Sequence, residues 1–204
     1  PPVFFHHATA PTEIYTLSLH DALPILYFLR SSEQKITTDM LHYAYRLDEV
    51  GKRVEDVLHL ETYSKFYGLS PKDLGLYALS EHKIAGAAWL RLLKEDENAN
   101  GFIDEKTPVL TIGIKPDFRA KGIGSTMLEQ LFLESGALFE RISVSVLKSG
   151  KALSFFKKHG FVEVENSFGK SPVDGSEVVT MVKELPKERV VRPSDGYDPR
   201  RWMD

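Results

Sequence analysis

The chain has 204 residues, of which 42% are hydrophobic, a formal net charge of −3 and no cysteine. This length predicts one domain with tails, and the hydrophobic share is enough for a packed core. The small charge excludes a global basic field for nucleic acid, and the lack of cysteine excludes disulfides and thiolate metal sites. No apolar run reaches the length of a membrane span, so we expect no membrane partner. The absence of cysteine is compatible with a reducing cytoplasm, which is the expected location, and the net charge predicts no nucleic-acid partner.

The first 25 residues are set apart from the rest. They contain no Lys or Arg, so they lack the positive region of a secretory signal. Residues 12–25 resemble translated sequencing-adapter read-through, which predicts a non-native or disordered segment over residues 1–25; a genuine, poorly ordered terminus is the alternative. His6 and His7 fall in this segment and are given no metal role. The predicted organisation is this segment, a domain over residues 26–185 and a charged tail over residues 186–204.

The first half of the domain shows short apolar runs and helical periodicity. The aromatic-rich run 26–29 predicts a strand, and the two apolar runs before residue 93 predict a hairpin in which Trp89 is a core residue. Between them, apolar spacing predicts two helices. The predicted elements are a strand over 26–29, a helix capped at Thr37-Thr38-Asp39 and running to Leu47, a helix over 56–66, and strands over 76–79 and 84–92.

The stretch after this hairpin imitates a calcium loop. Asp96, Asn98, Asn100 and Gly101 have the spacing of the loop's opening, but position twelve is Thr107 instead of the bidentate Glu that calcium needs. Strands are predicted on both sides, whereas the calcium loop joins helices. We therefore predict a solvated loop with Gly101 at the turn, and no metal site.

The central motif is a strand, a glycine loop and a helix. Residues 109–114 read as a buried strand, Pro116 ends it, and residues 119–124 form a loop with Gly122 and Gly124. The first turn of a helix leaves backbone N–H groups without partners at the positive end of the helix dipole. Glycines leave those groups accessible, so the motif predicts a phosphate-binding site.

Two common phosphate motifs do not fit. The dinucleotide fingerprint requires a third glycine where Met127 stands, and the nucleoside-triphosphate loop that could end at Gly169-Lys170-Ser171 lacks its first glycine, because Val164 stands there. The remaining elements predicted from periodicity are a half-exposed strand over 142–146, a helix through residues 152–156 that ends at His159-Gly160, a strand over 161–164, a turn at Asp174-Gly175 and a strand over 178–182.

The pattern Arg119-x-x-Gly122-x-Gly124, after a strand that ends in Ile114-x-Pro116, resembles the acyl-coenzyme A loop of the GNAT superfamily of N-acetyltransferases. The run from Ser149 through Phe156 to Gly160-Phe161 is similar to the second signature of that family. The resemblance covers residues 26–185. It implies an α/β (α+β) fold with a central mixed, mostly antiparallel sheet of six to seven strands flanked by about four helices.

The resemblance also implies a reaction. It predicts an acetyl-CoA-dependent N-acetyltransferase that moves an acetyl group to a primary amine of a small molecule or peptide by direct attack in a ternary complex, with no metal. A homodimer is compatible with it. The residues that it assigns to acetyl-CoA binding are Ile112, Gly113, Ile114, Arg119, Ala120, Lys121, Gly122, Ile123, Gly124, Ser125, Ser149 and Phe156.

The catalytic assignment departs from the family pattern. The N–H of Ile114 is the expected donor to the developing oxyanion. Phe156 stands where the family usually has an acidic Tyr, and Ser149 stands where it usually has Asn. Glu105, just before the strand, is a candidate base, and Ser149 a candidate for orienting water. Because of these departures, an acyl-CoA-binding module without transferase activity is the alternative function.

Two further assignments stay open at this stage. The resemblance places the acceptor beside the segment that follows the first strand, so Tyr63, Phe66 and Tyr67 are acceptor-pocket candidates; packing in the core is the alternative for each tyrosine. Gly113, an isolated strand glycine, marks either a bulge or a close approach to the ligand.

Overall fold

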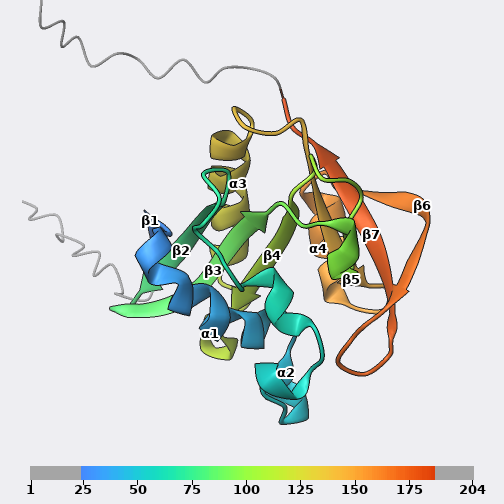
Figure 1. Ribbon diagram of the computed structural model, residues 1–204. Helices are drawn as coiled ribbons and strands as arrows, with labels where there is room; N and C mark the ends of the chain where they lie inside the picture. The colour runs from blue at the N-terminus through green and yellow to red at the C-terminus, as the bar shows by residue number, and fades with distance from the viewer. Residues whose placement is uncertain (1–23, 187–204) are drawn as a thin grey trace, which may run out of the picture.

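A seven-stranded mixed sheet forms the centre of the computed structural model, which describes residues 24–186 (Figure 1). Its strand order is β1-β2-β3-β4-β5-β7-β6, and only the β4–β5 pair is parallel among these described strands. The predicted mixed, mostly antiparallel sheet is confirmed. The strands are β1 Ile25–Phe28, β2 Leu74–Ser80, β3 Lys83–Arg91, β4 Val109–Ile114, β5 Arg141–Leu147, β6 Val162–Lys170 and β7 Glu177–Glu184.

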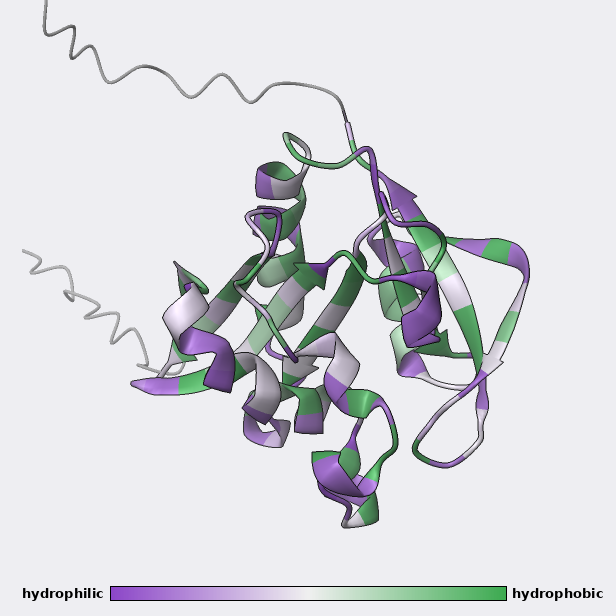
Figure 2. Ribbon diagram, viewed as in Figure 1, coloured by the Kyte–Doolittle hydropathy of each residue, from purple (hydrophilic) through white to green (hydrophobic). Residues whose placement is uncertain are grey.

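Helices cover both faces of the sheet. Helix α1 packs against β4 and β3, whereas α3 packs on β2, β3 and β4 from the other face, and α4 contacts β5. The central strands are hydrophobic to neutral along their length, as expected for strands covered on both sides (Figure 2). The helices are α1 Gln34–Ala44, α2 Leu47–Val50, α3 Ile123–Ser135 and α4 Lys151–Lys158.

Two hydrophobic clusters result, one on each face. The predicted core position of Trp89 is confirmed, since its side chain is fully buried in the cluster under α1. The other cluster contains the apolar stripe of α3, with Met127, Leu128 and Leu131 completely buried. Successive residues of β4 therefore alternate between two cores.

The predicted helix over residues 56–66 is wrong. The segment instead forms short 3-10 turns at Val54–Asp56 and Leu60–Tyr63. The indole Nε1 of Trp89 donates to the carbonyl of Tyr63 at 2.7 Å, and the Arg91 guanidinium donates to the carbonyl of Thr62. These tertiary bonds use carbonyls that an α-helix would need for its own i→i−4 ladder.

The predicted start of the first helix is also wrong. Helix α1 begins at Gln34, after a 3-10 turn in which the Glu33 carboxylate accepts from the N–H of Arg30. Thr37 does not cap the helix but lies buried inside it, and its hydroxyl donates back to the carbonyl of Gln34 at 2.7 Å.

Strand β5 is less exposed than its period-two pattern predicted. Ser143 is fully buried, and its hydroxyl donates to the carbonyl of Pro108. The loop that imitates a calcium site packs here: a Cβ at Gly101 would lie 3.1 Å from the backbone nitrogen of Ser145. The side-chain amide of Asn100 donates to the carbonyl of Lys170 at 2.8 Å, so this loop covers β5 and contacts β6.

Gly113 is required by helix packing. The register between β3 and β4 is constant, so no bulge is present at this residue. A Cβ at position 113 would lie 2.3 Å from the carbonyl oxygen of Met40 and 3.0 Å from the backbone nitrogen of Ala44. The glycine therefore lets α1 lie directly on β4, and a close approach to the helix, not a bulge, explains it.

We expect Gly113→Ala to lower the free energy of unfolding by about 1–3 kcal/mol, because the added methyl group meets helix backbone that cannot rotate away. Gly124→Ala is the matched control: its Cβ would lie 3.4 Å from Phe155, an ordinary contact, and alanine favours the helix. Urea denaturation measures both variants. Equal stability of Gly113→Ala and wild type would contradict the packing account.

Candidate functional site

Strands β4 and β5 meet at one end and separate at the other. Within residues 24–186, their pairing is limited to Val109 opposite Ser143, where the N–H of Ser143 donates to the carbonyl of Pro108 at 3.0 Å. In contrast, β4 pairs with β3 and β5 pairs with β7 along their full lengths. The sheet is therefore two half-sheets that share a single parallel contact.

This separation leaves backbone groups of β4 without a partner strand on the β5 side. Lys115 and Ala85 face each other, and the N–H of Lys115 donates to the carbonyl of Ala85 at 2.9 Å. In an antiparallel pair, hydrogen-bonded and non-hydrogen-bonded pairs alternate. Gly113 therefore bonds to β3, whereas Ile112 and Ile114 direct their backbone groups toward the β5 side, beyond the last contact with β5.

The closed end of this split is fixed by Arg141 of β5. Its guanidinium donates to the Thr107 hydroxyl at 2.9 Å and to the Asp104 carboxylate at 2.6 Å. Burial acts to raise the pKa of Asp104, but the hydrogen bonds from Arg141 and from the N–H groups of Lys106 and Thr107 lower this pKa to about 2. The loop before β4 is thereby held to the start of β5.

The glycine loop lies after the open end of β4. Ala120 and Gly122 both take left-handed conformations, with φ of 60° and 81°. The first i→i−4 bond of α3 runs from the N–H of Thr126 to the carbonyl of Gly122. The N–H groups of Ile123, Gly124 and Ser125 precede it and have no acceptor within the helix. A non-glycine residue in the left-handed region is an observed strain of the kind found at ligand sites.

Helix α4 and strand β4 meet the first turn of α3. A Cβ at Gly124 would lie 3.4 Å from the ring of Phe155 and 3.8 Å from the side chain of Ile112. The Ser125 hydroxyl and Nε2 of His159 form a 3.0 Å hydrogen bond. Burial lowers the pKa of His159, with Lys158 and Lys183 acting in the same direction and Glu129 opposing them. The start of α3 is therefore joined to the end of α4.

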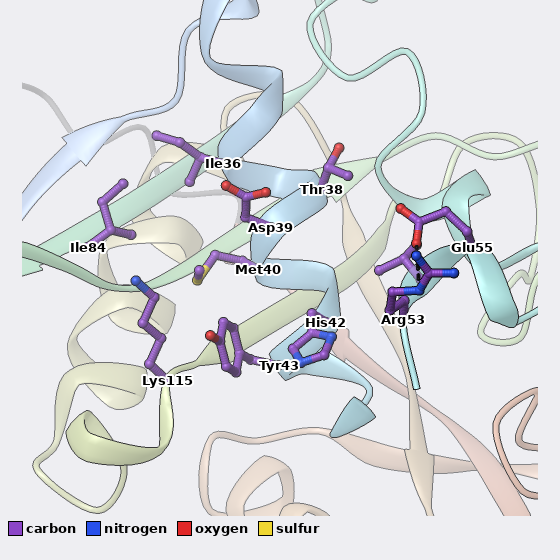
Figure 3. Close-up of a pocket in the computed structure, with 11 residues that line it drawn as sticks. Ile36, Thr38, Asp39, Met40, His42, Tyr43, Arg53, Glu55, Ile84 and Lys115 are labelled. Atoms are coloured by element: carbon purple, nitrogen blue, oxygen red, sulfur yellow. Dashed lines mark ion pairs between the residues drawn. The ribbon is translucent and has the colours of Figure 1, made fainter. Parts of the chain in front are cut away.

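A depression of about 430 Å³ lies beside α1, on the face of the sheet opposite to α3 (Figure 3). Its lining includes Asp39, Met40 and Tyr43 of α1, with Ile84 of β3 and Lys115 after β4. None of the three predicted acceptor residues lines it.

Of those three residues, Tyr63 and Tyr67 are buried in the same hydrophobic cluster, whereas Phe66 is exposed. The Tyr63 hydroxyl donates to the carbonyl of Asn100 at 3.0 Å, and the Tyr67 hydroxyl donates to the carbonyl of Leu29 at 3.3 Å; both side chains are buried. Burial raises the pKa of both tyrosines. Phe66 is 55% exposed. These contacts match the alternative of core packing for the two tyrosines.

The predicted catalytic residues are dispersed. Glu105 is exposed and precedes β4 by four residues, whereas Ile114 ends that strand, so roughly 17 Å of extended chain separates even Val109 from Ile114. Ser149 is exposed just before α4, whereas Phe156 is 5% exposed and packs edge-on against Phe155 and Phe161. Glu105 does not reach Ile114 in this arrangement.

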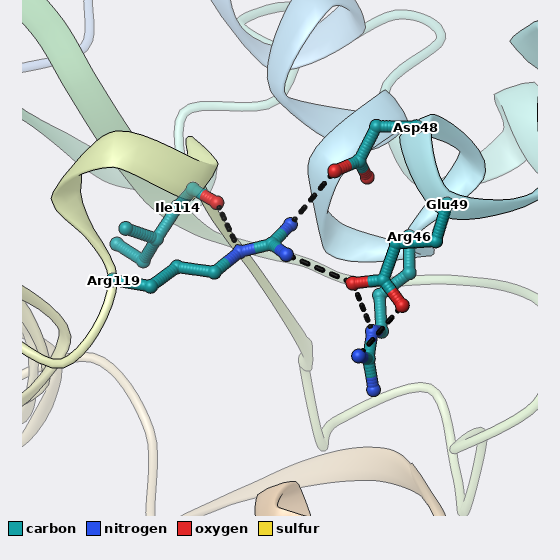
Figure 4. A network of polar contacts seen from close by, with 5 residues as sticks. All are labelled: Arg46, Asp48, Glu49, Ile114 and Arg119. Carbon is teal, nitrogen blue, oxygen red and sulfur yellow. Dashed lines mark hydrogen bonds and ion pairs between the residues drawn. The ribbon is translucent and has the colours of Figure 1, made fainter.

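Arg119 has partners that the sequence did not predict (Figure 4). Its N–H donates to the carbonyl of Pro116, and its Nε donates to the carbonyl of Ile114 at 3.0 Å. Its two terminal nitrogens reach Glu49 at 2.9 Å and Asp48 at 3.4 Å in α2. No local signal indicates this network, because α2 precedes Arg119 by about 70 residues.

Comparison with known proteins assigns the fold. Residues 72–163, which contain β4 and the glycine loop, match the family model described as an acetyltransferase (GNAT) domain. This segment is therefore similar to a GNAT acetyltransferase domain. No curated protein sequence matches the chain significantly. Within residues 24–186, no helix is long and apolar enough to cross a bilayer, and no group of three or more His, Cys, Asp or Glu side chains is placed to hold a metal ion.

Solved structures share the GNAT fold at low sequence identity. A GNAT-family acetyltransferase from Streptococcus pneumoniae has a TM-score of 0.58 at 18% identity and covers 80% of this chain and 100% of its own. A phosphinothricin acetyltransferase from Sinorhizobium meliloti, solved with acetyl-CoA, has a TM-score of 0.58 at 17% identity. The alignment covers 86% of this chain and 96% of that protein. The ribosomal-protein-S18-alanine N-acetyltransferase from Escherichia coli has a TM-score of 0.54 at 14% identity. The alignment covers 83% of this chain and 99% of that protein.

The Asp104 contact predicts an acid-dependent loss of stability. Because the folded pKa, about 2, lies below the ordinary value of 3.8, the contribution is complete above about pH 4 and is lost as the pH falls toward 2. We expect Asp104→Asn to lower the free energy of unfolding at pH 7 by about 1 kcal/mol. The effect is small because the ion pair between Arg141 and Asp104 is partly exposed. Urea denaturation from pH 7 to pH 3 should show that the difference in free energy of unfolding between this variant and the wild type becomes smaller below pH 4. A difference that grows as the pH falls would contradict this account.

Proposed function

We propose that the protein is an acetyl-CoA-dependent N-acetyltransferase. The observation that carries the proposal is the edge of β4 at Ile112 and Ile114, which pairs with no strand on the β5 side and lies beside the first turn of α3, within the segment that matches the GNAT model; only the Ile114 carbonyl is occupied there, by Arg119. A strand edge pairs with extended amide-bearing chains, and a helix start attracts phosphate. Acetyl-CoA presents both groups, an amide-containing arm and a pyrophosphate.

The residues of the loop fit this ligand. The left-handed conformations of Ala120 and Gly122 turn the loop, and a Cβ at Gly122 would meet nothing within 4 Å, so the surface there is open. We assign the pyrophosphate to the N–H groups from Ala120 to Ser125. Lys121 supplies charge, with its Nζ 5.4 Å from the ring of Phe118. The side chain of Arg119 is outside this assignment, because it is committed to Ile114 and α2.

The chemistry follows from the strand edge. The amine nitrogen forms a bond to the acetyl carbonyl carbon, the carbon–sulfur bond breaks with its electron pair leaving on the thiolate, and the proton that the amine nitrogen loses passes to solvent water. The N–H of Ile114 is assigned as donor to the carbonyl oxygen as negative charge develops on it. A thiol has a pKa of about 8.5, so the leaving group departs as a thiolate near neutral pH without requiring an acid at Phe156.

We expect acetyl-CoA to bind the wild type with a dissociation constant in the micromolar range and not to bind Gly124→Glu, whose carboxylate enters the assigned pyrophosphate seat. Leu133→Glu, which adds a carboxylate at an exposed position more than two turns further along α3, is the matched control and should bind like the wild type. Isothermal titration calorimetry measures the binding, and circular dichroism confirms that each variant is folded. A folded wild type that does not bind acetyl-CoA would overturn the proposal.

Activity is tested with the protein that binds. Acetyl-CoA is supplied with single amines of different class, namely glycine, lysine, spermidine and an alanine-terminated peptide, and thiol release is recorded. The proposal predicts amine-dependent release with at least one of them that is lost in Gly124→Glu. Binding of acetyl-CoA without release for any amine would instead establish a binding module without transferase activity.

A further inference from the structure

We propose that Arg119 is a positioning residue for acyl transfer, which fixes the peptide after Ile114 and thereby the direction of the Ile114 N–H. This inference rests on the proposed function for its catalytic consequence. Its structural part concerns contacts that are present without any ligand: Arg119 Nε to the Ile114 carbonyl, and the guanidinium to Asp48 and Glu49.

The peptide between Ile114 and Lys115 is held at both of its polar ends. Its carbonyl oxygen accepts from Arg119 at 3.0 Å, while its N–H donates to the carbonyl of Ala85 at 2.9 Å. Because a peptide unit is planar, holding it at both ends fixes its orientation. The last residue of β4 is thereby kept extended although β5 has already moved away.

The location of the bond explains why it matters for the N–H. In the alternating pattern of β4, the N–H and carbonyl of Ile114 both point away from β3, to the side where no strand pairs with this residue. An acyl oxygen that approaches the N–H therefore has the Ile114 carbonyl as its neighbour. Occupation of that carbonyl by Arg119 reduces its repulsion of developing negative charge and prevents rotation of the strand end.

The anchor of Arg119 is electrostatic but the network has no net charge. Arg46 and Arg119 supply two positive charges, and Asp48 and Glu49 supply two negative charges. The Asp48 side chain is only 17% exposed, and its Oδ1 is buried without a hydrogen-bond partner among the described residues. The network therefore fixes geometry and does not attract anionic acetyl-CoA.

Two substitutions separate the hydrogen bond from the ion pairs. In Arg119→Gln, the side-chain amide nitrogen lies the same number of bonds from Cα as arginine Nε, so the donor to Ile114 is retained while both ion pairs are lost. Arg119→Met keeps the chain length and removes the donor. Arg53→Met, which removes an exposed pair with Asp56, is the control for loss of a surface arginine.

The first readout needs no ligand. In ¹⁵N NMR spectra of the free protein, Arg119→Met should shift the amide signals of Ile114 and Lys115 and raise the exchange rate of Lys115 at least tenfold, whereas Arg119→Gln should leave both near wild type. Unchanged Ile114 and Lys115 signals in Arg119→Met would overturn the positioning role, whatever the activity of the protein.

The second readout is the split between binding and turnover. We expect Arg119→Met to lower kcat by roughly 10- to 100-fold, as for a misplaced catalytic group, with the acetyl-CoA dissociation constant within about threefold of wild type, and Arg119→Gln to retain most of kcat. A weaker affinity with unchanged kcat would make Arg119 a cofactor ligand instead. Equal loss of kcat and stability in both variants would make it a structural residue only. Absence of acetyl-CoA binding or amine-dependent release by the wild type overturns the proposed function, and the NMR result still decides the contact.

Discussion

The single contact between β4 and β5 is the constraint on which the rest of the site depends. A continuous sheet would satisfy every backbone group of β4 and would leave no edge inside the domain. Here β4 belongs to one half-sheet and β5 to the other, and the two are held together at Val109 and Ser143. The same separation that costs hydrogen bonds provides an internal strand edge, which soluble domains otherwise expose only at their margins.

Both ends of this split are stabilised by arginine. At the closed end, Arg141 joins the loop before β4 to β5 through Thr107 and Asp104. At the open end, Arg119 holds the last peptide of β4 to α2. Each guanidinium uses its fork of donors to bind two or more oxygens at once, which a lysine could not do with the same fixed geometry. The strand edge between the two arginines therefore lacks a partner strand, but its position is fixed at both ends.

The sequence predicted those features that depend on local pattern. The strand over residues 109–114, the glycine loop and the apolar stripe of α3 were all predicted because periodicity and glycine spacing are local signals. Residues 56–66 were predicted as a helix and form 3-10 turns, because Trp89 and Arg91 compete for their carbonyls from another strand. The network around Arg119 joins residues about 70 positions apart, so a single sequence carries no sign of it. Gly113 was predicted to mark a bulge or a close approach to the ligand, but helix α1 is what approaches it, which no local signal in the sequence indicates. The cofactor, catalytic and acceptor assignments stay predictions.

Amide hydrogen exchange along β4, followed by NMR with and without acetyl-CoA, tests the central claim most directly. Thr111 and Gly113 bond to β3, so their amides should exchange slowly in both states. The amides of Ile112 and Ile114 should exchange faster in the free protein and become protected when acetyl-CoA is added. Equal protection of all four amides without ligand, or no change at Ile112 and Ile114 on saturation, would contradict the account of an open strand edge that receives acetyl-CoA.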